Sequence, residues 1–506
     1  MAAAWAWLSG LRGWHAGAAA AALGAVSAAA LPPVHAIPVL LVAVPGLLAL
    51  IGGSAGVREA GWRGFWFGFG QHVLGLYWIT EAILVESARF WWLVPLAVPA
   101  LAAVLALFIA LPCAISRLAP AGWRRAATLA GLWVLADLAR QFVGSGFPWN
   151  PLGSAWAVPG PFGDVALQPA AWVGVHGLTL LTLALAATPA LGRRAMAAGI
   201  LTLALWAGAG AARLWLAVPA PPPGLAVVLV QGNVPQGHKW DRAFALETFE
   251  RYLALTRAGM ARLAAEHPGR PAAVVWPESA SPFLLAQDAG ARAEIAAAAG
   301  APALVGTVRF DALRRPRNSL VAVLGDGPPA AIYDKWHLVP FGEYQPGWLP
   351  LVIPVVPGGG FDRGPGPRTL HVNGLPPAGV LICYEAIFPA QVTDAADRPD
   401  WLVNVTNDAW FGNSTGPRQH LAAARLRAVE EGLPLMRAAN TGISAGFDGF
   451  GRELGRLGMN RAGVLVLELP GALPATPFAR LGLAVPLALG VAVAFAGLLA
   501  PRRRRI

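Results

Sequence analysis

The sequence is poor in charged residues. They make up 13% of its 506 residues, whereas hydrophobic residues make up 56%. Soluble domains carry about a quarter charged residues, so this composition argues against an ordinary soluble protein. It indicates that much of the chain lies in lipid.

Cysteine and lysine are also scarce. The only cysteines are Cys113 and Cys383, and Cys113 lies in a long apolar run. A disulfide framework is therefore not expected, and Cys383 is predicted to be a free thiol. Lys239 and Lys335 are the only lysines among 38 basic residues. Because an ammonium is a compact donor whose pKa can be shifted, each lysine is a candidate for chemistry. No partner suggests itself for Lys239, which is expected at the surface.

The net charge of +11 comes from basic residues that are scattered singly or in pairs, apart from Arg502, Arg503, Arg504 and Arg505. A nucleic-acid partner would call for a clustered basic patch. Membrane topology explains the scatter better, so no nucleic-acid binding is expected.

Eight apolar stretches predict membrane-spanning helices. They cover residues 17–31, 37–53, 65–85, 91–115, 126–138, 165–191, 195–217 and 481–500. Most approach the roughly 20 residues that cross a bilayer, although the first and fifth are short. The alternative for the first stretch is a cleaved signal peptide. Six further spans follow it, so a retained helix is favoured.

Arginines mark every second connection between these spans: Arg12; Arg58 and Arg63; Arg117, Arg124 and Arg125; Arg193 and Arg194; and the final four. By the positive-inside rule, both termini are cytoplasmic. The long segment between the last two spans then faces the non-cytoplasmic side of the membrane.

The predicted organisation has four parts: a membrane domain at 1–217, a proline-rich linker at 218–224, an α/β domain at 225–475, and a final membrane helix with a basic tail at 476–506. Apolar runs predict buried strands at 225–230, 272–276, 303–308, 319–324, 378–383, 401–405 and 463–467. Helices are predicted at 242–266 and 419–431.

Three polar residues follow predicted strands directly: Glu278, Lys335 and Cys383. Strand ends of α/β folds open into a shared crevice, so these side chains are expected to converge. A thiol is a strong nucleophile that is mostly protonated at neutral pH. A carboxylate can take its proton, and an ammonium can stabilise an oxyanion. Taken alone, each residue is also compatible with a core thiol or a solvated charge.

The motifs around these residues resemble those of the nitrilase (carbon-nitrogen hydrolase) superfamily, and within it the membrane-bound apolipoprotein N-acyltransferase family. They are Trp276-Pro277-Glu278, Tyr333-Asp334-Lys335, Phe341-Gly342-Glu343 and Cys383-Tyr384-Glu385, with Asn233 to Gln236, Lys239 to Asp241, Asn404 to Gly412, Gly75 to Trp78 and Gly146 to Trp149. The resemblance covers nearly the whole chain.

The resemblance implies a polytopic α-helical membrane domain and an α-β-β-α sandwich. It also implies a ping-pong acyl transfer from a phospholipid, through a Cys383 thioester, to the amine of a diacylglyceryl-cysteine apolipoprotein. Glu278 would be the general base, and Lys335 and the Tyr384 N–H would hold the oxyanion. No metal or other cofactor is implied, and a monomer is expected.

Supporting roles are less defined. Glu343 and Glu385 are expected to orient Lys335 or the amine, or to form structural ion pairs. By the resemblance, Trp240 and Trp410 are expected to line the substrate path. The segment 344–364 is rich in proline and glycine and is expected to form either a lid or an ordered crossover. Asp137 and Arg140 are expected to anchor a helix end, with a functional role as the alternative.

Three other functions remain as alternatives. The sequence from Gly412 to Gly416 matches the serine-hydrolase elbow, but the required acid and histidine do not follow it in order. A membrane-tethered amidase would use the same three residues on water, although it has no need of a membrane half. A transporter or scaffold would have no reason to keep all three.

Overall fold

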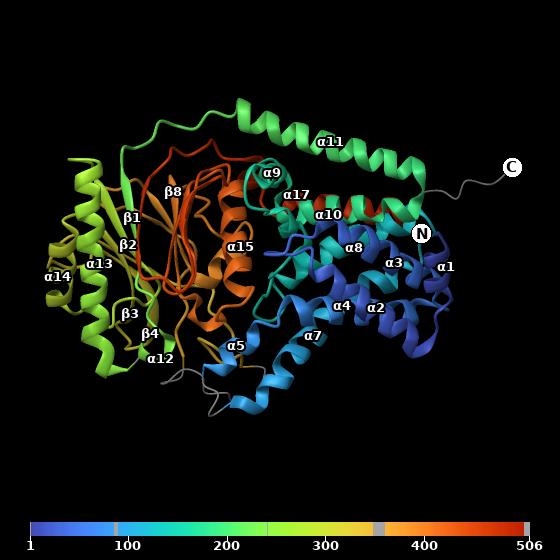
Figure 1. The fold of residues 1–506 in the computed structure, drawn as a ribbon, viewed down its shortest axis with the longest axis horizontal. Helices are drawn as coiled ribbons and strands as arrows, with labels where there is room; N and C mark the ends of the chain where they lie inside the picture. Colours follow the sequence, from blue (N-terminus) through green and yellow to red (C-terminus); the bar gives the residue numbers. More distant parts are fainter. Residues whose placement is uncertain (1, 86–89, 240, 348–359, 500–506) are drawn as a thin grey trace. The chain divides into compact units, whose positions relative to one another are not determined.

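The computed structural model describes residues 2–85, 90–239, 241–347 and 360–499 (Figure 1). The chain divides into two compact units. The first comprises Met1–Leu216 and Pro477–Ile506, and the second comprises Ala217–Thr476.

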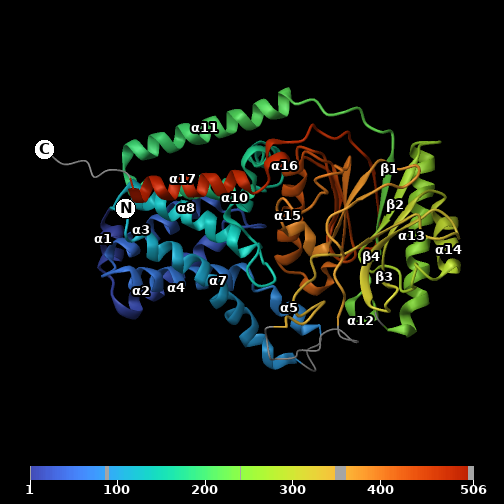
Figure 2. The same ribbon diagram turned by 180° about the vertical axis from the view of Figure 1, so that it is seen from behind.

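The first unit is helical. Its helices of ten residues or more are α2 (Gly13–Ala28), α3 (Leu40–Gly53), α4 (Val57–Gly75), α7 (Val94–Ser116), α8 (Trp123–Arg140), α10 (Ala170–Leu191), α11 (Arg193–Leu216) and α17 (Ala484–Leu499). Shorter helices are α1 (Ala2–Gly10), α5 (Ile79–Leu84), α9 (Pro161–Ala166) and α16 (Pro477–Leu481). The last long helix, α17, lies beside α8 (Figure 2).

Three helical stretches of the described chain are long and apolar enough to cross a membrane: Trp91–Ser116, Ala170–Leu191 and Arg193–Leu216. Two shorter apolar helices cover Ile37–Gly53 and Ala484–Leu499. The other expected spans are also helical, but their helices are shorter than these three or contain more charged residues. The first unit is thus an α-helical membrane domain, as expected.

The expected third span, 65–85, was misplaced. Helix α4 begins at Val57 and ends at Gly75, so Arg58 and Arg63 lie within the helix rather than in a connection. Arg63 is fully buried, is paired with Glu59 one turn earlier, and donates to the main-chain oxygens of Leu50 and Leu11 at 2.5 and 2.9 Å. Because these contacts compensate its charge, the helix can begin before the apolar stretch does.

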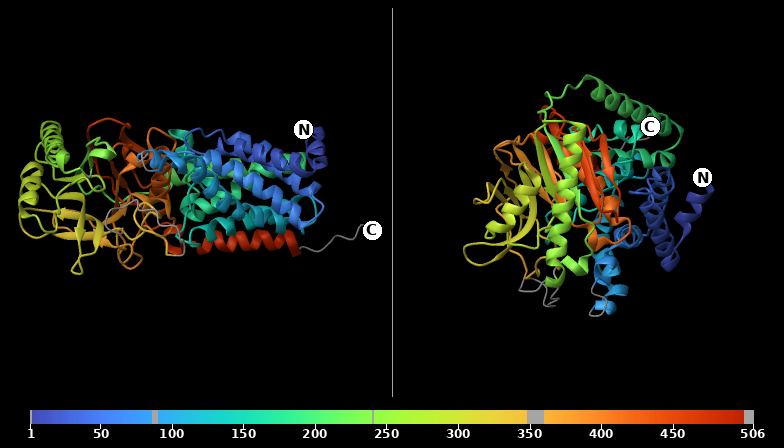
Figure 3. Two further views of the ribbon diagram at one scale, coloured as in Figure 1. Left: turned by 90° about the horizontal axis from the view of Figure 1, so that it is seen from below. Right: turned by 60° about the vertical axis from the view of Figure 1, so that its left-hand side comes forward.

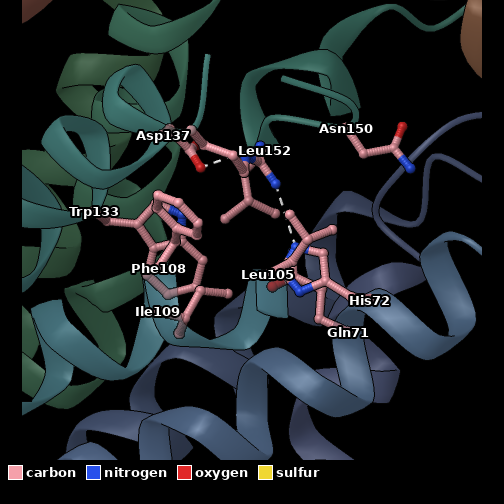
Figure 4. Close-up of a pocket in the computed structure, with 10 residues that line it drawn as sticks. Gln71, His72, Leu105, Phe108, Ile109, Trp133, Asp137, Asn150 and Leu152 are labelled. Carbon is pink, nitrogen blue, oxygen red and sulfur yellow. Dashed lines mark hydrogen bonds and ion pairs between the residues drawn. The ribbon is translucent and has the colours of Figure 1, made fainter. Parts of the chain in front are cut away.

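A second buried charge lies where α8 ends. Nη2 of Arg140 is 3.2 Å from Oδ1 of Asp137, and its Nη1 donates to Nε2 of His72 on α4 at 3.3 Å. These groups line a small cavity whose wall also includes Trp133 and Leu152 (Figure 4). Arg140, paired with Asp137, therefore connects the end of α8 to α4 by a hydrogen bond, consistent with the expected anchoring role.

The second unit contains two six-stranded sheets. One has the order β12-β1-β2-β3-β4-β5 and the other β11-β10-β9-β8-β7-β6. The first-sheet strands are β1 (Ala226–Gln231), β2 (Ala272–Trp276), β3 (Ala303–Phe310), β4 (Pro316–Val323), β5 (Ala331–Asp334) and β12 (Gly463–Glu468). Those of the second are β6 (Thr369–Leu370), β7 (Ala378–Ile382), β8 (Trp401–Thr406), β9 (Leu435–Ala439), β10 (Ser444–Phe447) and β11 (Glu453–Leu457).

Alternate side chains of each sheet enter different cores. Val227 and Leu229 of β1 pack with residues of the other sheet, such as Val380 and Val403. Val228 and Val230 pack instead beneath helices α13 (Ala245–Glu266) and α14 (Ala289–Ala299). Since successive strand residues face opposite sides, the sheet is buried on both faces.

The second sheet is covered in the same way by α15 (Gly416–Glu431), with Leu402 and Leu435 packed against Leu421 and Ala424. Figures 1 and 3 show the resulting helix–sheet–sheet–helix layering of this unit. The expected α-β-β-α sandwich is therefore correct.

The chain enters and leaves the second unit at neighbouring points. Ala220 N donates to the Ala472 main-chain oxygen at 2.8 Å, and Leu469 N donates to that of Leu225 at 2.9 Å. The first and last strands, β1 and β12, are paired antiparallel. The proline-rich linker thus lies alongside the segment through which the chain returns to the helical unit.

Candidate functional site

Glu278 lies two residues beyond the carboxyl end of β2 and is buried. A glycine on the neighbouring strand makes room for its main chain. A Cβ on Gly306 of β3 would lie 2.1 Å from the Pro277 oxygen and 2.7 Å from the Glu278 Cα. The main chain at Glu278 can therefore occupy this position only because residue 306 of β3 has no side chain.

Lys335 follows β5 directly, and its side chain is 1% exposed. Nζ donates to Oε1 of Glu278 at 3.0 Å and to the Glu343 carboxylate at 2.9 Å. Burial lowers the pKa of this ammonium, but Glu278 and Glu343 outweigh burial and raise it above its usual range. Lys335 is therefore a permanent cation between two carboxylates.

Uncharged hydrogen-bond donors also bind the Glu278 carboxylate. The Asn318 side-chain amide donates to Oε1 of both Glu278 and Glu343 at 2.8 Å, and Asn407 N donates to Oε2 of Glu278 at 2.9 Å. Burial raises the pKa of Glu278, but Lys335 and Lys239 outweigh it and hold the pKa below its usual range. Glu278 is thus a carboxylate at neutral pH.

Cys383 follows β7 and opens a short 3-10 helix, Cys383–Ile387. Its φ of 50° lies in the left-handed region, which side chains other than glycine seldom adopt. Burial raises the pKa of the thiol, Glu278 raises it further, and Lys335 opposes them. The resting site therefore pairs a protonated thiol with an ionised carboxylate, the starting state for general-base activation.

The sheet registers explain why these residues converge. Strands β1, β2 and β3 are parallel, so they end at the same edge of the first sheet. Strand β4 runs in the opposite direction and begins at that edge, near Asn318. Strand β5 runs opposite to β4 and ends there again, directly before Lys335. Strands β7 and β8 are parallel in the other sheet, so Cys383 after β7 and Asn407 after β8 lie at the same edge of that sheet. The three residues that were predicted to converge thus come from both sheets.

Glu385 does not bond to Lys335. Its carboxylate accepts from the main-chain N of Ile382 and of Trp336, each at 2.7 Å, and from the Tyr333 hydroxyl at 3.1 Å. Burial raises the pKa of Glu385 to about 7, and the N–H donors oppose this shift. Glu385 therefore joins the backbone on either side of the site, whereas Glu343 is the carboxylate that contacts Lys335.

Lys239 is not a surface residue, and that expectation was wrong. It ends a short helix, Gln236–Lys239, is half-buried, and donates from Nζ to the main-chain oxygen of Glu278 at 2.7 Å. Burial lowers the pKa of Lys239 to about 8, with Glu278 and Cys383 opposing and Lys335 adding to the shift. Both lysines of the chain therefore contact Glu278, one at its carboxylate and one at its main chain.

Replacing Lys239 with methionine should move the acid limb of the pH–rate profile. This ammonium helps to lower the pKa of Glu278, so its removal lets the pKa rise and the Glu278 carboxylate become protonated at higher pH. We expect the limb to shift upward by about one pH unit. The measurement is kcat/KM against pH. The exposed Arg242→Met is the matched control, and an unmoved limb in Lys239→Met would contradict the prediction.

Other predicted site residues are placed as follows. Tyr384 is the next residue in the 3-10 helix and is buried. Trp410 lies half-buried in the short helix Asp408–Phe411, after β8. Trp240 lies outside the described residues, as does most of the segment 344–364.

Several residues that hold the site were not singled out from the sequence. Asn318 bonds two carboxylates, and Asn440 links Val234 to Asn407 through its side-chain amide. Beneath Cys383 lies a buried group of Asp408, His420 and Arg437. The available signal was polarity within apolar surroundings, since Arg437 occurs in the run Leu-Met-Arg-Ala-Ala.

Comparison with known proteins covers both units. Residues 23–188 match the model of the apolipoprotein N-acyltransferase N-terminal domain, and residues 229–475 match that of carbon-nitrogen hydrolases. A yeast protein described as Nit3, a member of branch 10 of the nitrilase superfamily, aligns with 57% of this chain and 98% of its own at 17% identity and a TM-score of 0.36.

Curated relatives match over nearly the full length. The apolipoprotein N-acyltransferase of Bradyrhizobium diazoefficiens is 41% identical, covering 97% of this chain and 96% of its own. The apolipoprotein N-acyltransferase of Rhodopseudomonas palustris is 39% identical, covering 93% and 92%. At this identity over both units, the chain belongs to the apolipoprotein N-acyltransferase family.

Proposed function

We propose that the protein transfers an acyl chain from a phospholipid to the α-amine of the N-terminal diacylglyceryl-cysteine of apolipoproteins, by a ping-pong reaction through a Cys383 thioester. The observation that carries the proposal is the arrangement around Glu278. Its carboxylate is ionised and bonded to Lys335 at 3.0 Å, and both groups act electrostatically on the Cys383 thiol. Family membership supports the lipid and lipoprotein substrates.

In the first half-reaction, the Cys383 proton passes to Glu278 as Sγ attacks the ester carbonyl of the phospholipid. The oxyanion that forms is stabilised by the Lys335 ammonium and the Tyr384 main-chain N–H. When the tetrahedral intermediate collapses, the C–O bond breaks and the departing alkoxide takes the proton from Glu278. Lysophospholipid leaves, and the acyl chain remains on Cys383.

In the second half-reaction, the neutral amine of the lipoprotein attacks the thioester carbonyl. Glu278 takes the proton that the amine loses, and the same donors hold the second oxyanion. The C–S bond then breaks, and the Cys383 thiolate regains a proton from Glu278. Neither half-reaction calls for a metal or an organic cofactor. Trp410 and Trp240 are proposed to line the path of the substrates.

The proposed location is the bacterial inner membrane, with both termini cytoplasmic, the α/β domain periplasmic and the protein monomeric. The positive-inside pattern supports this orientation. Within the helical unit, Arg124 at the start of α8 donates to the Gly497 and Leu498 main-chain oxygens at 3.0 and 3.1 Å. The start of α8 and the end of α17 thus share one end of the bundle, as two cytoplasmic ends should.

The test is an acyl-transfer assay with purified protein in mixed micelles. The protein is given a phospholipid with one labelled acyl chain and a diacylglyceryl-cysteine peptide, and N-acylated peptide is measured by mass spectrometry. We expect labelled amide to form with release of one lysophospholipid per product. A peptide whose amine is blocked by acetylation is the matched control, and it should leave the thioester to accumulate.

The tethered-amidase alternative gives a different result in the same assay. If water is the acceptor, labelled fatty acid is released with no acylated peptide. That outcome would exclude N-acyl transfer while leaving Cys383 as the nucleophile.

A further inference from the structure

The short segment 361–364 is hydrogen-bonded to the main chain of two residues of the site. Phe361 N donates to the main-chain oxygen of Glu343 at 2.7 Å, and Gly364 N donates to that of Lys335 at 2.8 Å. The side chains of Lys335 and Glu343 are paired at 2.9 Å. The two residues are therefore held to one another through their side chains and to one segment through their main chains.

A glycine lets this segment approach the site closely. A Cβ on Gly364 would lie 2.1 Å from the main-chain oxygen of Asp334 and 2.8 Å from its carbonyl carbon. These atoms belong to the peptide bond that joins Asp334 to Lys335. The segment is thus packed directly against the chain that carries the ammonium.

Arginines at the start of β4 bind the same segment. Nη2 of Arg317 donates to Oδ2 of Asp362 at 3.1 Å, and its Nη1 donates to the Arg363 main-chain oxygen at 2.5 Å. Nη1 of Arg315 lies 2.8 Å from the same Asp362 oxygen. Asp362 N donates to the Pro316 main-chain oxygen at 2.8 Å. Three successive residues, from the turn into β4, therefore bind Asp362.

Arg317 also contacts two other aspartates. Its Nη2 donates to Oδ2 of Asp311 at 3.1 Å, and its Nη1 lies 3.8 Å from Oδ2 of Asp334. Arg309 binds both carboxylate oxygens of Asp334, at 2.7 and 2.5 Å. These groups form an arginine–aspartate cluster with three charges of each sign: Arg309, Arg315, Arg317, Asp311, Asp334 and Asp362.

The arginine–aspartate cluster determines where the segment lies. Residues 361–364 belong to neither sheet, so strand pairing does not place them. A single exposed ion pair contributes little, because solvent screens it. Here each aspartate has two arginine partners, and the central Arg317 side chain is only 12% exposed. The contacts of Asp362 are therefore stronger than those of an isolated surface pair.

We propose that Arg317 and Asp362 are positioning residues, which fix the segment 361–364 against the main chain of the site and so keep the Lys335 ammonium between its two carboxylates. Nζ contacts these carboxylates at 3.0 and 2.9 Å, so a backbone shift of about 1 Å would break one of the contacts. The effect on the reaction rate rests on the proposed function. The effect on the segment does not, so the two can fail separately.

The first test measures amide hydrogen exchange by mass spectrometry in Asp362→Asn, with the full chain in nanodiscs. The Asp362 side chain is 40% exposed, so the substitution leaves the core intact. We expect exchange in peptides covering 360–366 to rise about 3- to 10-fold, and exchange in β2 to stay unchanged. Asp397→Asn is the matched control, because Asp397 is also exposed and pairs with His371 at 2.7 Å outside the cluster. Unchanged exchange at 360–366 in Asp362→Asn would overturn the proposal.

The second test follows acylation of Cys383 from labelled phospholipid in a single turnover. We expect the rate constant to fall about 3- to 10-fold in Asp362→Asn and about 10- to 100-fold in Arg317→Met, with KM for the phospholipid unchanged. Arg317→Lys should recover only part of the loss, because one ammonium cannot replace the two nitrogens that bind Asp362 and the Arg363 oxygen. Asp397→Asn should match the wild type.

The amplitude and the rate constant separate folding from positioning. The amplitude reports the fraction of folded protein, so a lower amplitude with an unchanged rate constant would make the cluster merely structural and overturn the proposal. If Arg317→Met does not fold, the exposed Arg315→Gln replaces it, because it removes the other cation from Asp362. Failure of the wild type to form acyl-protein at Cys383 would refute the proposed function and the predicted effect on the rate, while the exchange result would stand.

Discussion

Cys383→Ala is expected to abolish the acyl-enzyme and to reduce N-acyl transfer about 10⁴-fold or more, as loss of the nucleophile does in other acyl-transfer enzymes. The thiol is the group on which Glu278 and Lys335 both act. Alanine removes Sγ and keeps Cβ, so the strained backbone is not altered further. The measurement is trapping of labelled acyl-protein, which hydroxylamine should release as expected of a thioester.

The chain provides its own matched control, because Cys113 is the only other cysteine. It is buried in helix α7 of the helical unit. Cys113→Ala should retain both the labelled acyl-protein and the transfer rate. Acyl-protein formed by Cys383→Ala, or lost only in Cys113→Ala, would contradict the assignment of the nucleophile.

Lys335→Met is expected to reduce activity about 10³- to 10⁴-fold and to destabilise the second unit by about 3–5 kcal/mol. Nζ lies between Glu278 and Glu343 with almost no exposure. Without the ammonium, two carboxylates share one buried site, so one of them must take up a proton. The base is then lost together with the oxyanion contact. Steady-state transfer and thermal unfolding measure the two effects.

A second substitution separates stability from catalysis. In Lys335→Met combined with Glu343→Gln, only one of the two carboxylates that contact Lys335 remains, namely Glu278. We expect most of the lost stability to return while the activity stays low, because the amide relieves the repulsion but supplies no cation. Recovery of activity in the double variant would show that Lys335 acts only by neutralising Glu343.

The sequence predicted seven of the strands, namely β1, β2, β3, β4, β7, β8 and β12, and the convergence of Glu278, Lys335 and Cys383, because buried strands are continuous apolar runs that end in polar residues. It missed β6, β9, β10 and β11, and it indicated β5 only as a short apolar run before Lys335. Strands β5 and β10 have four residues each, and β9 carries the buried Arg437. Short or polar strands depend on tertiary partners that no local pattern contains.

The errors at Lys239 and Arg63 both involve main-chain acceptors. Lys239 was placed at the surface because no partner suggested itself, and Arg63 was placed in a connection because of the positive-inside pattern. The partner of Lys239 is a main-chain oxygen 39 residues away, and Arg63 donates to main-chain oxygens 13 and 52 residues away. Every residue has a main-chain oxygen, so a sequence pattern cannot show which of these oxygens will accept a hydrogen bond from a buried cation.

The paired entry and exit of the second unit, where Ala220 meets Ala472 and β1 pairs with β12, make it a modular insertion. Its two ends are joined by hydrogen bonds made within the unit itself. The second unit therefore holds its first and last strands together by contacts of its own, so the pairing of β1 with β12 does not depend on the helical unit.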